Sequence, residues 1–279
     1  NSTTIEIKDS LVSIGYHVDS FNFRSIANNH SYFIRFYKYI DFFLKKLNNA
    51  GLNFFYYNLL GRRSMRKELL NKNFKSYDIV LFTKCEFLDP NVFLYIKRFI
   101  KIFYYFFDTL DEISNYNLYD HFNFATKSFV VSKLMSKQLS NDLRIKKKIY
   151  YLPQAVDINK WHYNIDISKT IDLVFVGSRN QYRDDHIDYL KKNGIKIICY
   201  GLGYDGGEIY NKDLNLLYQK SKIALNFSRD DISFSIRVYQ IMASGCFVLS
   251  THSAELMNVF NKKVHYDEFI SPEDCLKKV

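Results

Sequence analysis

Short, almost entirely apolar runs recur along this chain, and helical periodicity lies between them. A strand that is apolar at nearly every position is buried on both faces, which is typical of a parallel sheet covered by helices. In the first half we expect helices at Thr3–Ile14 and Tyr32–Leu47. The strands expected there are His17–Phe23, Asn53–Asn58, Asp78–Thr83, Ile100–Phe107, Ser128–Val131 and Lys148–Leu152.

The second half repeats the same alternation. Its expected strands are Asp172–Val176, Ile195–Tyr200, Lys222–Asn226 and Cys246–Ser250. Its expected helices are Asp184–Lys192, Leu214–Lys220, Ser233–Ser244 and one that begins near Ser271. The pattern predicts an α/β fold of two tandem Rossmann-like, doubly wound domains that face a cleft, with residues 1–155 in the first and 156–279 in the second. A strand is expected before the first helix and is missing, and the chain stops soon after the helix near Ser271 begins. Both ends therefore look clipped.

The charge of the chain is concentrated in its first half. The whole sequence has 39 Lys and Arg against 29 Asp and Glu; residues 1–155 hold 23 and 13 of them, and residues 156–279 hold 16 and 16. Such an excess indicates an anionic partner, which could be a membrane surface, an acidic glycan, a lipid phosphate or nucleic acid. The alternative is that lysine-rich faces only solubilise the protein. Clusters of basic residues occur at Arg62, Arg63, Arg66 and Lys67, and at Lys146–Lys148.

The four cysteines are scattered, without CxxC spacing. This argues against a disulfide scaffold or a zinc site and suits a reducing compartment. The most apolar stretch, Val92–Phe107, contains three basic residues and is shorter than the ~20 apolar residues that a membrane-spanning helix needs. We therefore expect a cytoplasmic protein, with peripheral attachment to the inner face of the membrane through the basic first half as a possibility.

Small and polar residues follow the strands of the second half. In open parallel sheets, ligands bind beyond the carboxyl ends of the strands, so these residues predict a ligand site. The alternative is that they only form turns, in which Gly, Ser and Asn are common. The loop from Gly201 to Gly207 matches neither GxGxxG nor a Walker motif and favours a mobile loop. The strand-end residues are Gly177, Ser178, Tyr200, Gly201, Asn226, Ser228, Ser250 and Thr251.

The expected helix Ser233–Ser244 has a polar stripe beside its apolar face. Ser233, Arg237, Gln240 and Ser244 share that stripe, with Ser233 as the expected N-cap. A helix N-terminus with Arg237 one turn in suits a diphosphate. Gly245 then allows the turn into the next strand. The alternative is an ordinary amphipathic helix with a solvated polar face.

Acidic residues follow the strand Ile100–Phe107. Asp108 lies at its carboxyl end, where a carboxylate can act as a general base or contact an acceptor. The alternative is that Asp108, Asp111 and Glu112 only open the next helix. The sequence has no metal-binding motif, and we expect no metal.

Taken in order, these segments resemble the GT-B glycosyltransferases, above all the CgeB/YkvP-like group of the glycosyl transferases group 1 superfamily. The matching pieces include Tyr151–Asp157, Val174–Ser178 with Arg183, Cys199–Gly201, Lys222–Ser228 and Ser235–Gly245. In the first half, Tyr77–Lys84 and Tyr104–Asp108 resemble the acceptor-binding lobe.

The resemblance implies transfer of a sugar from a nucleotide-diphosphate sugar to a glycan, lipid-linked or protein acceptor, without a cofactor or bound metal and with retention of configuration. It implies donor contacts along the second half, with Arg237 on the diphosphate. Relatives usually have Glu at the position of Gln240, and a second Glu eight residues earlier is replaced by Ile232. The implied donor residues are Gly177, Ser178, Arg183, Tyr200, Gly201, Asn226, Ser228, Ser235, Arg237, Gln240, Ser244 and Gly245.

Two alternatives remain. Gln240 favours a non-catalytic GT-B module that binds a nucleotide sugar or glycan. The basic first half favours a nucleic-acid-binding protein, but the sequence has no recognised motif of that class and its aromatic residues look like core, so we expect no nucleic-acid partner.

Overall fold

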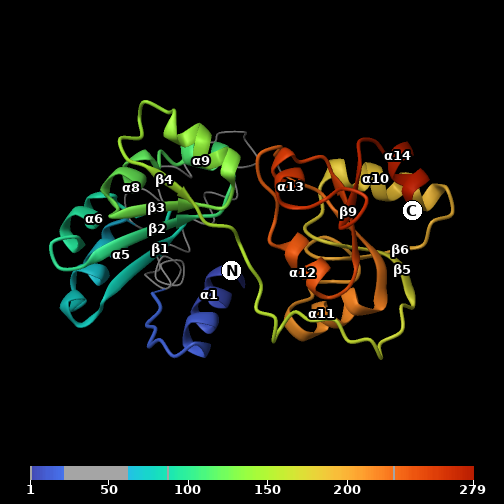
Figure 1. Cartoon of the computed structure of the whole chain (residues 1–279), viewed down its shortest axis with the longest axis horizontal. Helices are drawn as coiled ribbons and strands as arrows, with labels where there is room; N and C mark the ends of the chain where they lie inside the picture. The colour runs from blue at the N-terminus through green and yellow to red at the C-terminus, as the bar shows by residue number, and fades with distance from the viewer. Residues whose placement is uncertain (1, 22–61, 87, 229) are drawn as a thin grey trace, which may run out of the picture. The chain divides into compact units, whose positions relative to one another are not determined.

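The computed structural model describes residues 2–21, 62–86, 88–228 and 230–279 (Figure 1). These residues form two compact units: Asn1–Val131 with Ser136–Leu152, and Ser132–Met135 with Pro153–Val279. The sequence-based division lies after residue 155. The predicted helix Tyr32–Leu47 and strand Asn53–Asn58 fall outside the described residues.

The described part of the first unit contains a four-stranded parallel sheet in the order β1-β2-β3-β4. All four strands were expected from the apolar runs, with ends that differ by one or two residues. The strands are β1 (Ile79–Thr83), β2 (Lys101–Phe106), β3 (Lys127–Val130) and β4 (Ile149–Tyr151). The helices are α1 (Ser2–Ser13), α5 (Arg62–Leu70), α6 (Asn91–Ile96), α7 (Leu110–Asn115), α8 (Tyr119–Phe124) and α9 (Lys133–Ser140), with a 3-10 turn, η2, at Phe74–Ser76.

Aromatic side chains form the core of this unit. Tyr104 of β2 packs edge-on against Phe122 of α8, with ring centroids 4.9 Å apart, and against Phe93 of α6 at 6.0 Å. All three side chains are buried. Offset and edge-to-face ring pairs add stabilisation beyond the buried area. This packing explains why aromatic residues are so frequent in the β2 segment.

The second unit contains a five-stranded parallel sheet in the order β6-β5-β7-β8-β9. The strands are β5 (Ile171–Val176), β6 (Ile197–Tyr200), β7 (Ser221–Asn226), β8 (Phe247–Thr251) and β9 (Tyr266–Phe269). The helices are α10 (Gln181–Lys192), α11 (Asn211–Lys220), α12 (Arg237–Ala243), α13 (Ala254–Val259) and α14 (Pro272–Lys278). This is the predicted doubly wound arrangement.

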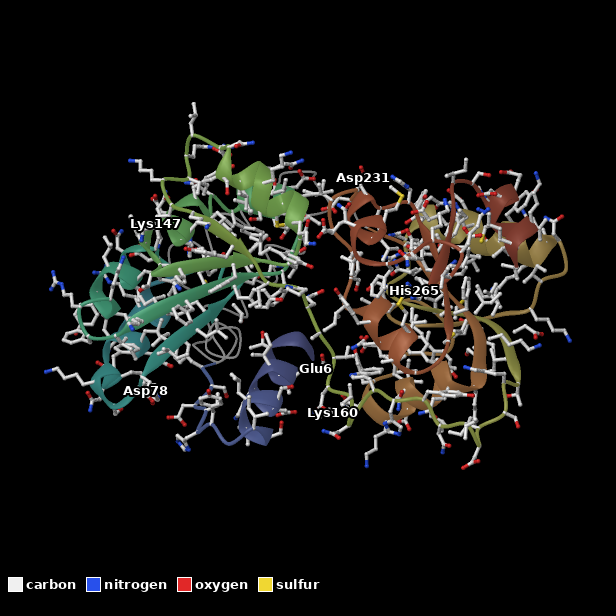
Figure 2. The ribbon with its side chains drawn as sticks, viewed as in Figure 1. Glu6, Asp78, Lys147, Lys160, Asp231 and His265 are labelled. Atoms are coloured by element: carbon white, nitrogen blue, oxygen red, sulfur yellow. The ribbon has the colours of Figure 1, made fainter. Side chains whose placement is uncertain are left out.

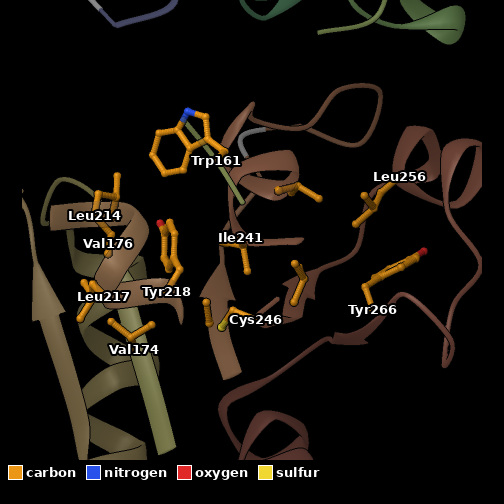
Figure 3. Close-up of a cluster of buried hydrophobic side chains, with 13 residues drawn as sticks. Trp161, Val174, Val176, Leu214, Leu217, Tyr218, Ile241, Cys246, Leu256 and Tyr266 are labelled. Atoms are coloured by element: carbon orange, nitrogen blue, oxygen red, sulfur yellow. The ribbon is translucent and has the colours of Figure 1, made fainter. Parts of the chain in front are cut away.

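Alternate residues of each strand in this sheet face two separate cores. Val174 and Val176 of β5 join Tyr218 of α11 and Ile241 of α12 on one face (Figure 3). Leu173 and Phe175 join residues of α10 and α14 on the other. Because both faces are covered, both sets of strand residues must be apolar, which produced the uninterrupted runs in the sequence.

Three sequence-based expectations differ from the structure. The described part of the predicted strand His17–Phe23, residues 17–21, has no strand conformation. Helix α12 begins at Arg237 rather than at Ser233, and its N-cap is Ile236 without a side-chain hydrogen bond. Strand β9 was not expected, since its sequence YDEF contains two acidic residues.

No helix in the described ranges is long and apolar enough to cross a membrane.

Candidate functional site

In the second unit, two glycines bring the ends of β5 and β6 into close contact. Gly177 N–H donates to Tyr200 O at 2.9 Å, and Gly201 N–H donates to Gly207 O at 2.6 Å. A Cβ built on Gly201 would lie 2.2 Å from Gly177 O, and the φ of Gly201 is +123°. Only glycine fits this position, because any side chain would collide with a backbone carbonyl and strain its own backbone.

Two arginines reach the same place. A Cβ built on Gly177 would lie 3.5 Å from an Nη atom of Arg183 and 3.5 Å from an Nη atom of Arg237. Arg183 belongs to α10 and Arg237 is the first residue of α12, so two helices deliver guanidinium groups to the carboxyl end of β5. Paired guanidinium groups beside a glycine are suited to an anion with several oxygen atoms, such as a diphosphate.

Local contacts fix the position of Arg183. The side chain of Asn180, the N-cap of α10, accepts a hydrogen bond from Arg183 N at 3.0 Å. The Arg183 guanidinium donates to Ser178 O and lies over the Phe175 ring, with Cζ 5.5 Å from the ring centroid. Ser178 itself has an exposed side chain. The guanidinium is therefore oriented before any ligand binds.

The glycine-rich loop is folded into consecutive turns. Tyr204 N donates to Gly201 O and Gly207 N donates to Tyr204 O, both at 3.0 Å. Tyr204 OH donates to Asp184 at 3.2 Å, and burial, followed by the charge of Asp184, raises the pKa of Tyr204 well above its ordinary value. Tyr200 packs against Gly206, where a Cβ would lie 2.9 Å from the ring. This loop borders the Gly177 site.

Two polar atoms at the end of β7 have no hydrogen-bond partner among the residues that the structure describes. Asn226 donates to Ser250 Oγ at 2.9 Å, but its Oδ1 is buried and unpartnered. Ser228 N donates to Thr251 Oγ1 at 2.8 Å, while Ser228 Oγ is also buried and unpartnered. Buried polar atoms without partners are rare in folded proteins, so each requires an explanation such as a bound ligand or water.

Side chains anchor the segment between β7 and α12. Asp230 Oδ1 accepts from Ser233 N at 2.8 Å and from Ser233 Oγ at 2.7 Å. The imidazole of His252 lies 3.2 Å from Asp231 and 3.4 Å from Glu268. Ser235 Oγ accepts from Arg237 N at 3.3 Å. These contacts hold residues 230–235 outside the helix, so Ser233 is not the N-cap that the sequence pattern predicted.

Three of the predicted donor residues lie within α12 or directly after it. Gln240 is buried in the middle of α12. Ser244 is fully buried, with Oγ 2.6 Å from Asn215 Oδ1 and 2.8 Å from Gln240 O. Gly245, with a φ of +69°, forms the turn before β8 at the opposite edge of the sheet. Part of the polar stripe is therefore buried, because neighbouring elements pack against it and exclude solvent.

Asp108 belongs to the first unit and lies at the carboxyl end of β2. It forms a short ion pair with Lys84 Nζ, and its Oδ1 accepts from Thr109 N at 3.0 Å. Glu112 lies 3.6 Å from the same Lys84 Nζ. Burial acts to lower the pKa of Lys84, but the hydrogen bond with Asp108 and the nearby carboxylates outweigh it and raise that pKa. Lys84 was not predicted as a site residue, although its position directly after an apolar strand is a usable signal.

No group of three or more His, Cys, Asp or Glu side chains is placed to hold a metal ion in the part of the chain that the structure describes.

Comparison with known proteins extends these observations. Residues 180–279 match the protein-family model described as glycosyl transferase-like. A search of curated proteins found no match. Among solved structures, Alr3699/HepE from Anabaena in complex with UDP and glucose is 14% identical, with a TM-score of 0.60 over 80% of this chain and 72% of that one.

Two further structures show the same likeness. Alr3699/HepE with UDP-glucose is 15% identical, with a TM-score of 0.58 over 77% of this chain and 70% of that one. A glycosyltransferase from Rickettsia africae ESF-5 is 14% identical, with a TM-score of 0.54 over 83% of this chain and 72% of that one. The chain therefore has the fold of the GT-B glycosyltransferases, with its residues 180–279 matching a glycosyl transferase-like family.

Proposed function

We propose that this protein is a glycosyltransferase that moves a sugar from a nucleotide-diphosphate sugar to a glycan or lipid-linked acceptor, in cell-surface polysaccharide or glycoconjugate synthesis. The family match and the fold support nucleotide-sugar glycosyl transfer as the general class of reaction. The observation that supports it most directly is the convergence of Arg183 and Arg237 on Gly177. The solved Anabaena relative was crystallised with UDP and with UDP-glucose, which agrees with a nucleotide sugar as the donor.

The proposed chemistry follows from these groups. The acceptor hydroxyl oxygen forms a bond to the anomeric carbon and gives up its proton, while the bond between that carbon and the diphosphate oxygen breaks and negative charge develops on the departing diphosphate. Arg183 and Arg237 would stabilise that charge, and positioned donors of this kind lower the barrier by several kcal/mol, about 10²- to 10³-fold in rate for one donor. Asn226 Oδ1 and Ser228 Oγ have no partner in the described part of the chain; Asn226 Oδ1 would accept from a donor hydroxyl group, and Ser228 Oγ would bind a donor hydroxyl group or phosphate.

We extend the proposal to the remaining expectations. Asp108 would contact the acceptor hydroxyl or remove its proton. Transfer would retain anomeric configuration and need no metal, and the protein would act in the cytoplasm. NMR of the product gives its anomeric configuration, and turnover in the presence of EDTA tests the metal requirement.

Nucleotide binding is the sharpest test. Thermal unfolding is measured with the UDP, GDP, ADP, CMP and dTDP forms of nucleotides and nucleotide sugars, while donor hydrolysis is followed in parallel. We expect one nucleotide class to raise the unfolding temperature, and Arg237→Ala to abolish that shift. Arg144→Ala is the matched control, because Arg144 is exposed in the first unit and pairs with Asp142. A shift that survives in Arg237→Ala contradicts the assigned site.

A non-catalytic module that binds a nucleotide sugar or glycan is the second candidate. The observation that favours it is the burial of Gln240, which occupies the position of the usual Glu without a charge. Such a module would show the nucleotide-dependent thermal shift but no turnover with any acceptor.

A further inference from the structure

In the first unit, basic residues concentrate at one edge of the sheet. The first residues of β2 and β3 and the segments before β2 and β4 contribute a group that we call the basic rim: Lys97, Arg98, Lys101, Lys127 and Lys146–Lys148. All four strands are parallel, so their amino-terminal ends share this edge. In Figure 2, Lys147 and Asp78 mark the two ends of the edge, since Asp78 precedes β1.

Contacts show that the loops of the basic rim are neighbours. Lys97 Nζ donates to Phe124 O at 3.3 Å and Lys147 Nζ donates to the adjacent carbonyl, Ala125 O, at 2.5 Å. Lys127 and Lys148 share the ring of Tyr150, with Nζ atoms 5.7 Å and 5.0 Å from its centroid. The rim is therefore continuous across β3 and β4.

Little negative charge offsets the basic rim. None of its side chains pairs with a carboxylate of the described residues. The carboxylates at this edge are Asp78 and Asp142, and Arg144 already holds Asp142 with two hydrogen bonds of 2.9 Å and 2.6 Å. Burial, followed by the neighbouring Lys97, lowers the pKa of Lys147 to about 8. The positive groups are thus crowded enough to oppose one another.

A purely structural role accounts for two members of the rim. Cations stabilise helix C-termini, where carbonyl groups lack intrahelical partners, and Lys97 and Lys147 meet the carbonyls that end α8. Arg98, Lys101 and Lys146 are exposed and have no such contact. A role in capping helices therefore leaves most of the charge unexplained.

Exposed apolar side chains lie within the same loops. Leu143, 97% exposed, directly precedes Arg144 and Lys146, and Phe99, 42% exposed, lies between Arg98 and Lys101. Leu94 and Tyr95 on α6 are also exposed. Apolar residues flanked by Lys and Arg are typical of surfaces that enter the headgroup region of a bilayer, where the cations meet anionic lipids. Nucleic acid fits the charge but gives an aliphatic side chain such as Leu143 no base-stacking role.

We propose that the basic rim, together with Leu143 and Phe99, is a docking surface for an anionic lipid bilayer. The lysines and arginines contact lipid phosphates, and the two apolar side chains enter the interface. The proposal is independent of the transferase activity, since it concerns the edge of the first sheet opposite to Asp108.

Vesicle binding by the whole chain, without donor or acceptor, tests this surface. Phosphatidylcholine vesicles are compared with vesicles that also contain phosphatidylglycerol, by co-sedimentation at low and high salt. We expect binding only to the anionic vesicles, and its loss at high salt. Equal binding to both vesicle types, or binding that salt leaves unchanged, would overturn the proposal.

Substitutions locate the surface. Because a basic residue near an anionic surface contributes ~1 kcal/mol, Lys146→Gln with Lys148→Gln weakens binding about 30-fold. Both side chains are exposed and lack carbonyl contacts, so the double variant should fold as the unmodified protein does. Lys146→Arg with Lys148→Arg keeps the charge and should bind the anionic vesicles normally. Leu143→Ser should weaken vesicle binding about tenfold, because the apolar side chain is no longer buried in the bilayer interface.

The matched control is Lys191→Gln with Lys192→Gln, two exposed lysines at the end of α10 in the second unit. This variant has the same net charge as the Lys146 and Lys148 variant and should bind as the unmodified protein does. Equal weakening in both variants would show that only net charge matters and would overturn the docking surface. Binding to duplex DNA or RNA without binding to anionic vesicles would also overturn it, in favour of a nucleic-acid partner.

Discussion

At the carboxyl edges of both sheets the chain passes through left-handed backbone, but different residue types adopt it. After β1, Lys84 and Cys85 adopt positive φ values of 56° and 41°, although neither is glycine. After β6, Gly201 adopts a φ of +123°. Left-handed backbone costs a non-glycine residue about 1–3 kcal/mol, so the turn after β1 must offset a strain that the turn at Gly201 avoids.

Contacts within the protein at the carboxyl edge of the first sheet offset this backbone strain. Lys84 forms ion pairs with Asp108 and Glu112, and Tyr104 OH donates to Lys84 O at 2.9 Å. The second edge has a glycine at position 177, beside which two arginines converge. The difference teaches that a parallel sheet supplies a carboxyl edge in both units, although the strand orders differ, whereas the residues after the strands decide which side chains converge there.

The largest effect is expected when the two arginines at the carboxyl edge of the second sheet are removed. Arg183→Ala combined with Arg237→Ala should lower donor turnover by at least about 10³-fold, because the departing diphosphate loses both stabilising groups. Steady-state kinetics with the nucleotide sugar identified by thermal shift measure this. Turnover within tenfold of the unmodified protein would mean that this edge does not bind the diphosphate.

The next effect concerns the close approach of the two glycines. Gly201→Ala should lower the free energy of unfolding by about 3–5 kcal/mol, since a methyl group would collide with Gly177 O as well as strain the backbone. Gly194→Ala is the control: its φ is +83°, but a Cβ there meets nothing within 4 Å. That variant should lose about 1 kcal/mol. Denaturant unfolding compares the two, and equal losses would refute the steric argument.

A smaller effect tests the ion pairs of the first edge. Lys84→Met leaves Asp108 and Glu112 half-buried without their cation and should lower the free energy of unfolding by about 2 kcal/mol. Lys222→Met, which breaks the exposed pair with Asp172, should cost less than about 0.5 kcal/mol. Similar losses in both variants would show that burial does not strengthen the Lys84 pairs.

The pH dependence of the same pair has a definite sign. The pKa of Lys84 is raised above its ordinary value of 10.5 in the folded protein. Its stabilisation is therefore fully present below about pH 10.5 and is lost as the pH rises through the folded pKa. Unfolding measured between neutral pH and pH 11 should show this loss, and Lys84→Met should not.

The smallest effect is expected from removing single hydroxyl groups, which compares a ligand-binding serine with a structural one. Ser228→Ala should leave stability within about 0.5 kcal/mol, because Ser228 Oγ has no partner among the described residues, yet weaken nucleotide binding several-fold. Ser250→Ala should instead cost about 1 kcal/mol, since Ser250 Oγ accepts from buried Asn226. If Ser228→Ala left nucleotide affinity unchanged, the unpartnered hydroxyl would have another explanation.

The sequence predicted elements well where one local pattern was sufficient. Strands such as β2 and β5 are largely buried, so nearly every residue had to be apolar. Strand β9 was missed because Asp267 and Glu268 interrupt the pattern. Lys262 pairs with Glu268 at 2.7 Å and Lys278 approaches Asp267 at 3.9 Å, and neither contact follows from periodicity.

Contacts between distant segments decided the rest. The polar stripe of residues 233–244 has helical spacing throughout, yet Asp230 and the bridge from Asp231 to His252 hold its first residues outside α12. The same packing buries Ser244 against Asn215. Periodicity describes what a segment can form, whereas competing hydrogen bonds from other elements determine where the helix begins.

The sequence by itself determined the alternation of strands and helices, the two-unit α/β organisation and the residue types at the strand ends, because these depend on local burial and backbone preference. Only the tertiary structure decided that Arg183 and Arg237 meet at Gly177, that Lys84 neutralises Asp108, and that the basic residues of the first unit gather at one edge. The physical reason is that charge and hydrogen bonding act through space, and the sheet order brings together groups that lie far apart along the chain.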